Sequence, residues 1–180
     1  MRTMVYVSAG QDKGQEEVQM ISLYRIDDRV IHGQTIVRLL PQYACDGIII
    51  IDDHISGNPQ LLGIYKQVVP DTTKLYCFSI EKAQRKLQEA KVSKKHYIVI
   101  FKSILTVKEL HDRGVKIMET INVGTASRKN DAKDLVVGFA LNQTEIDSYN
   151  YLDEKGYTFS ILPAGGVKKT LSWKELKDKA

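Results

Sequence analysis

The chain has 180 residues, of which 43% are hydrophobic and 27% charged, the composition of an ordinary globular protein. Lysine and arginine outnumber aspartate and glutamate by 26 to 22, and this interspersed excess of +4 is too small to predict nucleic-acid binding. The longest unbroken apolar run, Ile48–Ile51, is far shorter than the ~20 residues of a membrane helix, so we expect a soluble, cytoplasmic protein. The two cysteines, Cys45 and Cys77, form no closely spaced pair, which fits a reducing compartment.

Apolar runs alternate with segments of helical periodicity from Met20 onward. Residues 1–19 are polar and weakly patterned, and we expect them to be an extension, native or added, to a single domain over residues 20–180. Strands are expected at Ile21–Arg25, Gly47–Asp52, Lys74–Phe78, Tyr97–Phe101, Lys116–Asn122, Asp134–Phe139 and Tyr157–Leu162. Helices are expected at Gly33–Leu40, Pro59–Val69, Ile80–Ala90, Val107–Arg113, Thr144–Lys155 and Ser172–Lys179.

Helix boundaries support this assignment, because Ser79 and Thr106 suit helix starts and Gly114 and Gly156 suit helix stops. The run Gly47–Ile51 is typical of a strand buried on both faces, which means a parallel sheet between helices. The sequence therefore predicts an α/β fold, an open, doubly wound and mainly parallel sheet of about seven strands with helices on both faces. Ligands of such folds bind at the carboxyl ends of the strands.

The connection after the first strand is unusually rich in charge and contains His32, directly before Gly33 and the first helix. Backbone N–H groups at a helix start stabilise phosphate, and the guanidinium groups of Arg25 and Arg29 match phosphate oxygens. An aspartate, such as Asp28 or its neighbour Asp27, could accept one imidazole N–H and leave the other nitrogen as the nucleophile. On composition alone, a surface loop held by arginine–aspartate pairs remains an alternative.

The run Arg-Ile-Asp-Asp-Arg-Val-Ile-His-Gly-Gln, residues 25–34, resembles the signature of the IIB components of the mannose/fructose/sorbose family of bacterial sugar phosphotransferase systems. A looser resemblance extends from Met20 to about Pro163 and includes Ile49–Asp53 and Ile121–Gly124. It implies a mainly parallel seven-stranded sheet, in agreement with the pattern of strands.

The resemblance also implies a function, that of a protein-N(pi)-phosphohistidine–sugar phosphotransferase subunit. His32 would accept a phosphoryl group from a phosphorylated IIA protein or domain and pass it to a sugar held by the membrane subunits IIC and IID. The protein would then be associated peripherally with the inner face of the membrane. The identity of the sugar and the existence of a homodimer stay open.

The residues expected in the site follow from the same motif. His32, Asp28, Arg25 and Arg29 would be catalytic, and the expected phosphate-binding residues are Gly33, Gln34, Thr125, Arg128 and Lys129. Family members commonly have Gly-Gly-Met after Asn-(Ile/Val)-Gly. In this chain Gly124 is followed instead by Thr-Ala-Ser-Arg-Lys, residues 125–129. This departure leaves open whether Arg128 or Lys129 contacts the phosphate.

Other chemistries have weaker support. Asp52, Asp53 and His54 lie at the end of the second expected strand, but this carboxylate pair and histidine have no further ligand at a suitable spacing in the sequence, so no metal is expected. No GxGxxG or GxxxxGK motif is present, so no nucleotide cofactor is expected. The main alternative is a receiver-like signalling domain phosphorylated on aspartate, and a third reading is a small-ligand binding module without chemistry.

Overall fold

The computed structural model describes residues 20–117, 119–162 and 169–180, so the expected extension lies outside the described residues. The strands are β1 (Ile21–Ile26), β2 (Gly47–Ile51), β3 (Lys74–Phe78), β4 (Tyr97–Phe101), β5 (Ile121–Val123), β6 (Lys133–Val136), β7 (Phe139–Leu141), β8 (Phe159–Ile161) and β9 (Leu171–Ser172). The helices are α1 (Gly33–Leu39), α2 (Asp53–Ser56), α3 (Pro59–Lys66), α4 (Ile80–Lys91), α5 (Ile104–Asp112), α6 (Gln143–Glu154), α7 (Trp173–Leu176) and the 3₁₀ turn η1 (Lys177–Lys179).

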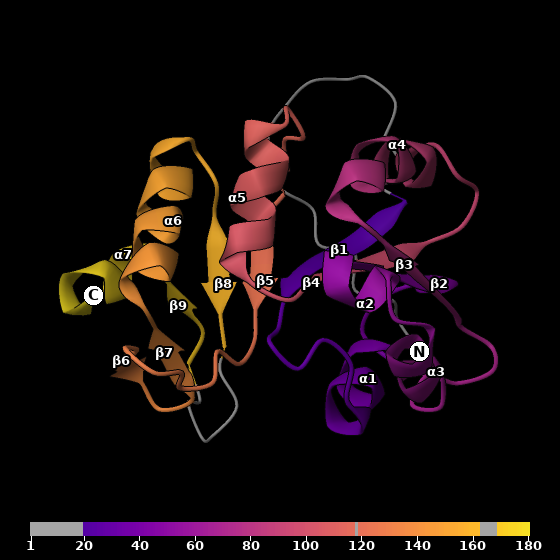
Figure 1. Cartoon of the computed structure of the whole chain (residues 1–180), viewed down its shortest axis with the longest axis horizontal. Coiled ribbons are helices and arrows are strands. Elements are labelled where there is room, and N and C mark those ends of the chain that lie inside the picture. The colour runs from indigo at the N-terminus through magenta and orange to yellow at the C-terminus, as the bar shows by residue number, and fades with distance from the viewer. Residues whose placement is uncertain (1–19, 118, 163–168) are drawn as a thin grey trace.

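Seven strands form one sheet in the order β3-β2-β4-β1-β5-β8-β9. All neighbours pair in parallel except β8 and the short β9, which are antiparallel. Strand β1 therefore lies in the middle of the sheet, between β4 and β5. This arrangement confirms the predicted α/β fold with a mainly parallel seven-stranded sheet (Figure 1).

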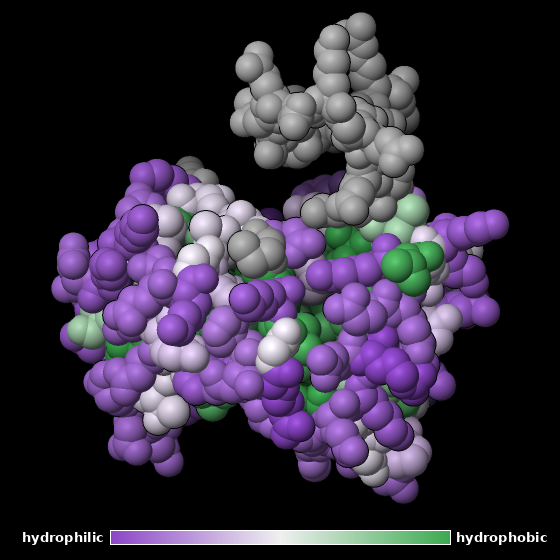
Figure 2. All heavy atoms as spheres, turned by 90° about the horizontal axis from the view of Figure 1, so that it is seen from above, coloured by the Kyte–Doolittle hydropathy of each residue, from purple (hydrophilic) through white to green (hydrophobic). Residues whose placement is uncertain are grey.

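The sheet is buried on both faces because helices cover each of them (Figure 1). Alternate residues of β2 point to opposite sides, so that Ile49 and Ile51 join one core and Ile48 and Ile50 the other. The first core also contains residues of α4, α5, α6 and α7, and the second contains residues of α1 and α2. Seen from above, the outer surface is mostly hydrophilic, with small hydrophobic patches between polar side chains (Figure 2).

The carboxyl end of β1 is a point at which the chain changes sides. Strand β1 leads into α1, which packs in one layer, whereas β4 and β5 lead to α5 and to β6, β7 and α6 in the other. Neighbouring connections that leave in opposite directions open a crevice at the strand ends, the usual ligand site of doubly wound sheets. His32, at the end of this connection, thus lies beside the expected location.

The structure corrects three of the expected elements. The strand expected over Asp134–Phe139 is the hairpin β6–β7, because Gly138, with φ of +76°, reverses the chain. The strand expected over Lys116–Asn122 is shorter and begins at Ile121, and part of the expected range, residue 118, lies outside the described residues. The helix expected to begin at Ser172 begins one residue later, as α7, because Ser172 is the last residue of β9.

Helix boundaries were predicted with mixed success. Ser79 caps α4 by accepting a hydrogen bond from the backbone N–H of Lys82, as expected. Gly114 and Gly156 follow α5 and α6 with φ of +86° and +87°, which confirms both stops. The start expected at Thr106 is wrong, because Ile104 already packs in the core and α5 begins there.

Candidate functional site

A buried ion pair at the carboxyl end of β1 joins Arg25, in that strand, to Asp27, the first residue after it. Arg25 Nη2 donates to Asp27 Oδ2 at 2.7 Å, and the two side chains are 11% and 1% exposed. Arg25 Nη1 also donates to the side-chain oxygen of Asn122 on the neighbouring β5. Because a buried charge is tolerated only when it is paired and hydrogen-bonded, this network holds the Arg25 guanidinium in one place.

The ion pair requires a glycine at the end of β5. A Cβ atom built at Gly124 would lie 2.5 Å from Asp27 Oδ2 and 2.8 Å from Arg25 Cζ, closer than real Cβ contacts. The Asn-Val-Gly sequence that ends β5 is therefore explained by contact with Arg25 and Asp27. Nothing local in the sequence assigns Asn122 or Gly124 to the site, because their contacts with Arg25 and Asp27 cross almost a hundred residues.

The turn between β1 and α1 begins at Asp27. Its carbonyl accepts the N–H of Val30 at 2.9 Å, and its Oδ1 accepts the N–H of Arg29 at 3.2 Å. Val30 is buried and has φ of +57°, a left-handed conformation that is strained for a β-branched residue. Such strain persists only where the surroundings over-determine the backbone, which here directs the chain from β1 toward His32.

The loops that follow β1 and β5 are joined by three hydrogen bonds. The N–H of Asp28 donates to the carbonyl of Thr125 at 3.2 Å, and Asp28 Oδ2 accepts the N–H of Ser127 at 2.7 Å. Arg29 Nη2 donates to Thr125 Oγ1 at 3.0 Å. The structure therefore brings together Asp28, Arg29 and Thr125, three residues expected in the site.

His32 is the residue immediately before α1, and its carbonyl accepts the N–H of Ile36. Its Nε2 lies 2.8 Å from Thr35 Oγ1, within hydrogen-bond distance. The structure thus gives the ring a threonine partner where an aspartate was expected. The sequence contains a signal for this contact. Thr35 lies three positions after His32, and residues at this spacing share one face of a helix.

The surroundings of His32 favour its neutral form. Partial burial lowers the pKa of its imidazole, and the positive charge of Arg29 lowers that pKa further. Arg25 acts in the same direction, while the carboxylates of Asp27 and Asp28 oppose it. A neutral imidazole keeps one nitrogen lone pair free, which a nucleophile requires at neutral pH.

The remaining expected phosphate ligands are less directly placed. Gly33 is the first residue of α1 and exposed, and the side chain of Gln34 is not among those described. Arg128 pairs with Asp134 on β6, and Lys129 pairs with Glu145, which is 3% exposed. Contact of either basic residue with phosphate stays a prediction.

The acids that follow β2 have structural partners. Asp52 Oδ1 accepts the N–H of Ile55 at 2.8 Å, and Asp53 Oδ1 accepts the N–H of Ile80 at 2.8 Å. Both carboxylates therefore cap helix starts. In the described part of the chain, no group of three or more histidine, cysteine, aspartate or glutamate side chains is arranged to hold a metal ion.

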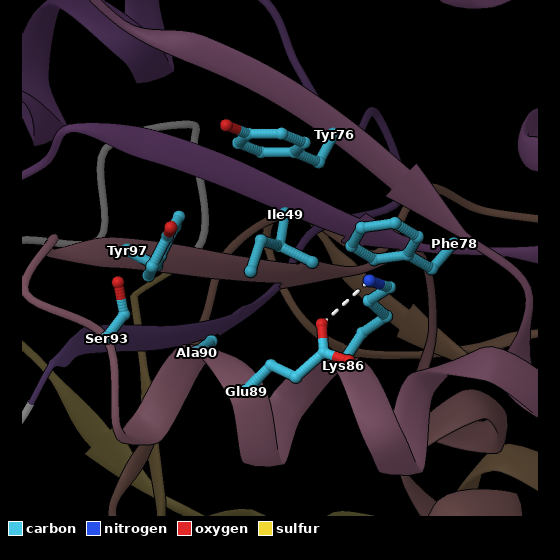
Figure 3. Close-up of a pocket in the computed structure, with 8 residues that line it drawn as sticks. All are labelled: Ile49, Tyr76, Phe78, Lys86, Glu89, Ala90, Ser93 and Tyr97. Carbon is cyan, nitrogen blue, oxygen red and sulfur yellow. Dashed lines mark hydrogen bonds and ion pairs between the residues drawn. The ribbon is translucent and has the colours of Figure 1, made fainter.

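A separate pocket lies between the sheet and α4 (Figure 3). Its walls are largely apolar and aromatic, with Tyr76, Phe78 and Tyr97 around it, and its charged groups Lys86 and Glu89 pair with each other at 2.7 Å. It belongs to the layer opposite α1, so His32 is not part of it. Its lining contains no histidine, and we do not assign phosphoryl chemistry to it.

The site at the end of β1 therefore combines an imidazole whose pKa is lowered with two guanidinium groups at the carboxyl edge of a doubly wound sheet. An imidazole nitrogen can bond to phosphorus, and guanidinium groups stabilise the anionic oxygens that arrive with it. This combination is suited to a protein that carries a phosphoryl group. None of the helices among the described residues is long and apolar enough to cross a membrane.

Comparison with known proteins leads to the same class. The family described as PTS system sorbose subfamily IIB component matches residues 21–176. The fructose-specific EIIB component of Bacillus subtilis is 27% identical over 141 residues, which cover 78% of this chain and 86% of that protein. The mannose-specific EIIAB component of Escherichia coli K12 is 24% identical over 148 residues, which cover 82% of this chain but only 46% of that longer protein.

The fold comparison agrees with the sequence comparison. The crystal structure of the IIBSor domain of the sorbose permease from Klebsiella pneumoniae matches with a TM-score of 0.76 and 23% identity, and the match covers 89% of this chain and 98% of that domain. The chain belongs to the PTS sorbose subfamily IIB component family. It is a subunit of a sugar phosphotransferase system, and nothing supports the alternative of a receiver phosphorylated on aspartate.

Proposed function

We propose that His32 is the residue that carries the phosphoryl group, which it accepts from a phosphorylated IIA protein or domain and passes to a sugar. The observation that supports this most directly is that the guanidinium groups of Arg25 and Arg29 both act on the His32 ring and lower its pKa, while Asn122 and Thr125 hold them at the end of β1.

The transfer consists of two displacements at phosphorus. In the first, an imidazole lone pair of His32 forms a P–N bond while the P–N bond of the donor breaks. In the second, a sugar hydroxyl oxygen forms a P–O bond, the P–N bond on His32 breaks and the hydroxyl proton is released. The imidazole is restored and acts again in the next cycle.

The two arginines have different parts in this scheme. Arg29 is exposed and rests on the Thr125 hydroxyl, so it can turn toward a phosphoryl group as the donor docks. Arg25 is held by Asp27 and Asn122, and its Nε is buried without a hydrogen-bond partner among the described residues. Arg25 thus supplies a fixed positive charge and Arg29 a movable one, while Asp28 keeps the two loops together through Ser127.

Partners and location follow from this role. The sugar would be held by the membrane subunits IIC and IID, so the protein would act at the cytoplasmic face of the membrane and bind there peripherally. The similar proteins are named as specific for fructose, mannose and sorbose, so a hexose is the substrate class that we expect. The choice among sugars would be made by the membrane subunits.

The test is labelling of the purified protein by phosphorylated IIA, followed by mapping of the modified peptide. His32→Gln should fold normally and take up no label, because glutamine cannot form the P–N bond. His54→Gln is the matched control, since His54 is an exposed histidine that follows the neighbouring strand β2, and it should be labelled as wild type.

The chemistry of the label separates histidine from aspartate. A P–N bond should break in mild acid, persist in base and resist hydroxylamine, whereas an acyl phosphate is cleaved by base and by hydroxylamine. Full labelling of folded His32→Gln, or a base-labile label on an aspartate peptide, would contradict the proposal.

A further inference from the structure

The two nitrogens of the His32 ring have different surroundings. Nε2 lies 2.8 Å from the hydroxyl oxygen of Thr35, which is 8% exposed and belongs to the first turn of α1. The helix fixes the distance between the two residues, because the carbonyl of His32 accepts the N–H of Ile36 as the first bond of that helix. The Thr35 hydroxyl therefore occupies the direction from which a phosphorus atom would have to approach Nε2.

The hydrogen bond between the two side chains can be formed in two ways. Either the Thr35 hydroxyl donates to Nε2 and the ring proton is on Nδ1, or Nε2–H donates to Thr35 and Nδ1 carries the lone pair. In the first arrangement the hydroxyl engages the Nε2 lone pair and Nδ1 carries a proton, so neither nitrogen is free to attack. Only the second arrangement leaves a lone pair on a nitrogen that Thr35 does not cover.

We infer that Thr35 is a positioning residue that holds the ring proton on Nε2 and leaves Nδ1 of His32 as the attacking nitrogen. The inference rests on the proposed phosphorylation of His32. It explains, through the side chain of Thr35, why the phosphoryl group would bond to one ring nitrogen and not to the other. Thr35 does not touch the phosphoryl group. It acts through the imidazole, by accepting its Nε2–H and by blocking Nε2.

The proton count is the same before and after the first transfer. The Nδ1 lone pair forms the new P–N bond, the donor P–N bond breaks, and the proton on Nε2 remains where it was. The phosphorylated ring is thereby cationic, so the bond from Nε2–H to Thr35 becomes charge-assisted, the stronger kind of hydrogen bond. When the phosphoryl group leaves for the sugar, the ring returns to its neutral Nε2–H form.

The test compares Thr35→Val, which keeps the shape and removes the hydroxyl, with Thr35→Ser, which keeps the hydroxyl. Nitrogen-15 NMR of the ring reports the tautomer, and phosphorus–nitrogen coupling in the phosphorylated protein reports which nitrogen carries phosphate. Wild type and Thr35→Ser should be Nε2–H tautomers labelled on Nδ1 alone. Thr35→Val should show a mixture of tautomers, a detectable Nε2 adduct and transfer slowed about fivefold, the effect of one lost hydrogen bond.

Thr106→Val is the control for the loss of a buried hydroxyl, because Thr106 is equally 8% exposed but lies on α5 in the opposite layer. It should leave tautomer and adduct as in wild type. An unchanged tautomer and a pure Nδ1 adduct in Thr35→Val would overturn the inference while His32 remained the carrier. Phosphate on Nε2 of the wild type would overturn it as well, whereas absence of any label on His32 would contradict the proposed function itself.

Discussion

Replacement of Gly124 by alanine tests whether the buried ion pair organises the site. The new Cβ would meet Asp27 Oδ2 at 2.5 Å and Arg25 Cζ at 2.8 Å, so the pair has to separate or β5 has to move away from β1. Breaking a buried ion pair costs about 3–5 kcal/mol. We expect a loss of about 3 kcal/mol in the free energy of unfolding, the lower end, because Arg25 can keep its bond to Asn122.

The assay is urea unfolding followed by circular dichroism, together with the rate of labelling by phosphorylated IIA. A loss of this size moves the urea midpoint down by about 1.5 M for an m-value of about 2 kcal/mol/M. Gly63→Ala is the control, because a Cβ there meets no atom within 4 Å in α3, and alanine should be neutral or stabilise the helix by up to about 1 kcal/mol. A loss in Gly124→Ala below about 1 kcal/mol, with wild-type labelling, would refute the reasoning.

Two further predictions concern Arg29. Arg29→Ala should slow phosphoryl transfer to His32 about ten- to a hundredfold, the effect of losing a charged donor, and leave the unfolding free energy near that of wild type because the side chain is exposed. The control is Arg85→Ala, which removes a guanidinium group that is 67% exposed on α4 and should leave the rate unchanged. Equal rates for wild type, Arg29→Ala and Arg85→Ala would exclude a role for Arg29. Arg29→Ala should also raise the pKa of His32, because the pKa is lowered by that positive charge. Transfer needs the neutral ring, so on acidification the variant should lose activity at a higher pH than wild type, and a pH–rate profile that does not move would contradict the assignment.

The buried pair and the exposed arginine show how stability and chemistry are divided in this site. Asp27 and Asn122 hold Arg25 at the cost of burying charge, which the fold tolerates because Asp27 neutralises the guanidinium group and Asn122 accepts a further N–H from it. Arg29 is left at the surface, where a partner can reach it, and the exposed hydrogen bond from its guanidinium group to Thr125 can be exchanged for one to that partner. A protein that must receive and release the same phosphoryl group can use both the fixed positive charge of Arg25 and the movable one of Arg29.

Local sequence determined the layered fold and pointed to His32 as the candidate phosphoryl carrier. The run Gly47–Ile51 is apolar at every position, and a strand of this kind has to be covered on both faces, as it is. The connection at residues 25–34, through its resemblance to the family signature, predicted a phosphoryl site at the end of the first strand, which the structure places in the middle of the sheet. These features are local in sequence, so periodicity and a continuous motif were sufficient to find them.

Only the tertiary structure decided which side chains meet. The contacts of Arg25 with Asn122 and of Arg29 with Thr125 depend on the parallel pairing of β1 with β5, and no spacing in the sequence specifies that pairing. The same holds for Lys129, which looked free as a phosphate ligand but is paired with a buried glutamate on α6. Strand order joins loops that are about a hundred residues apart, and for this physical reason the partners of each charge could be assigned only from the folded chain.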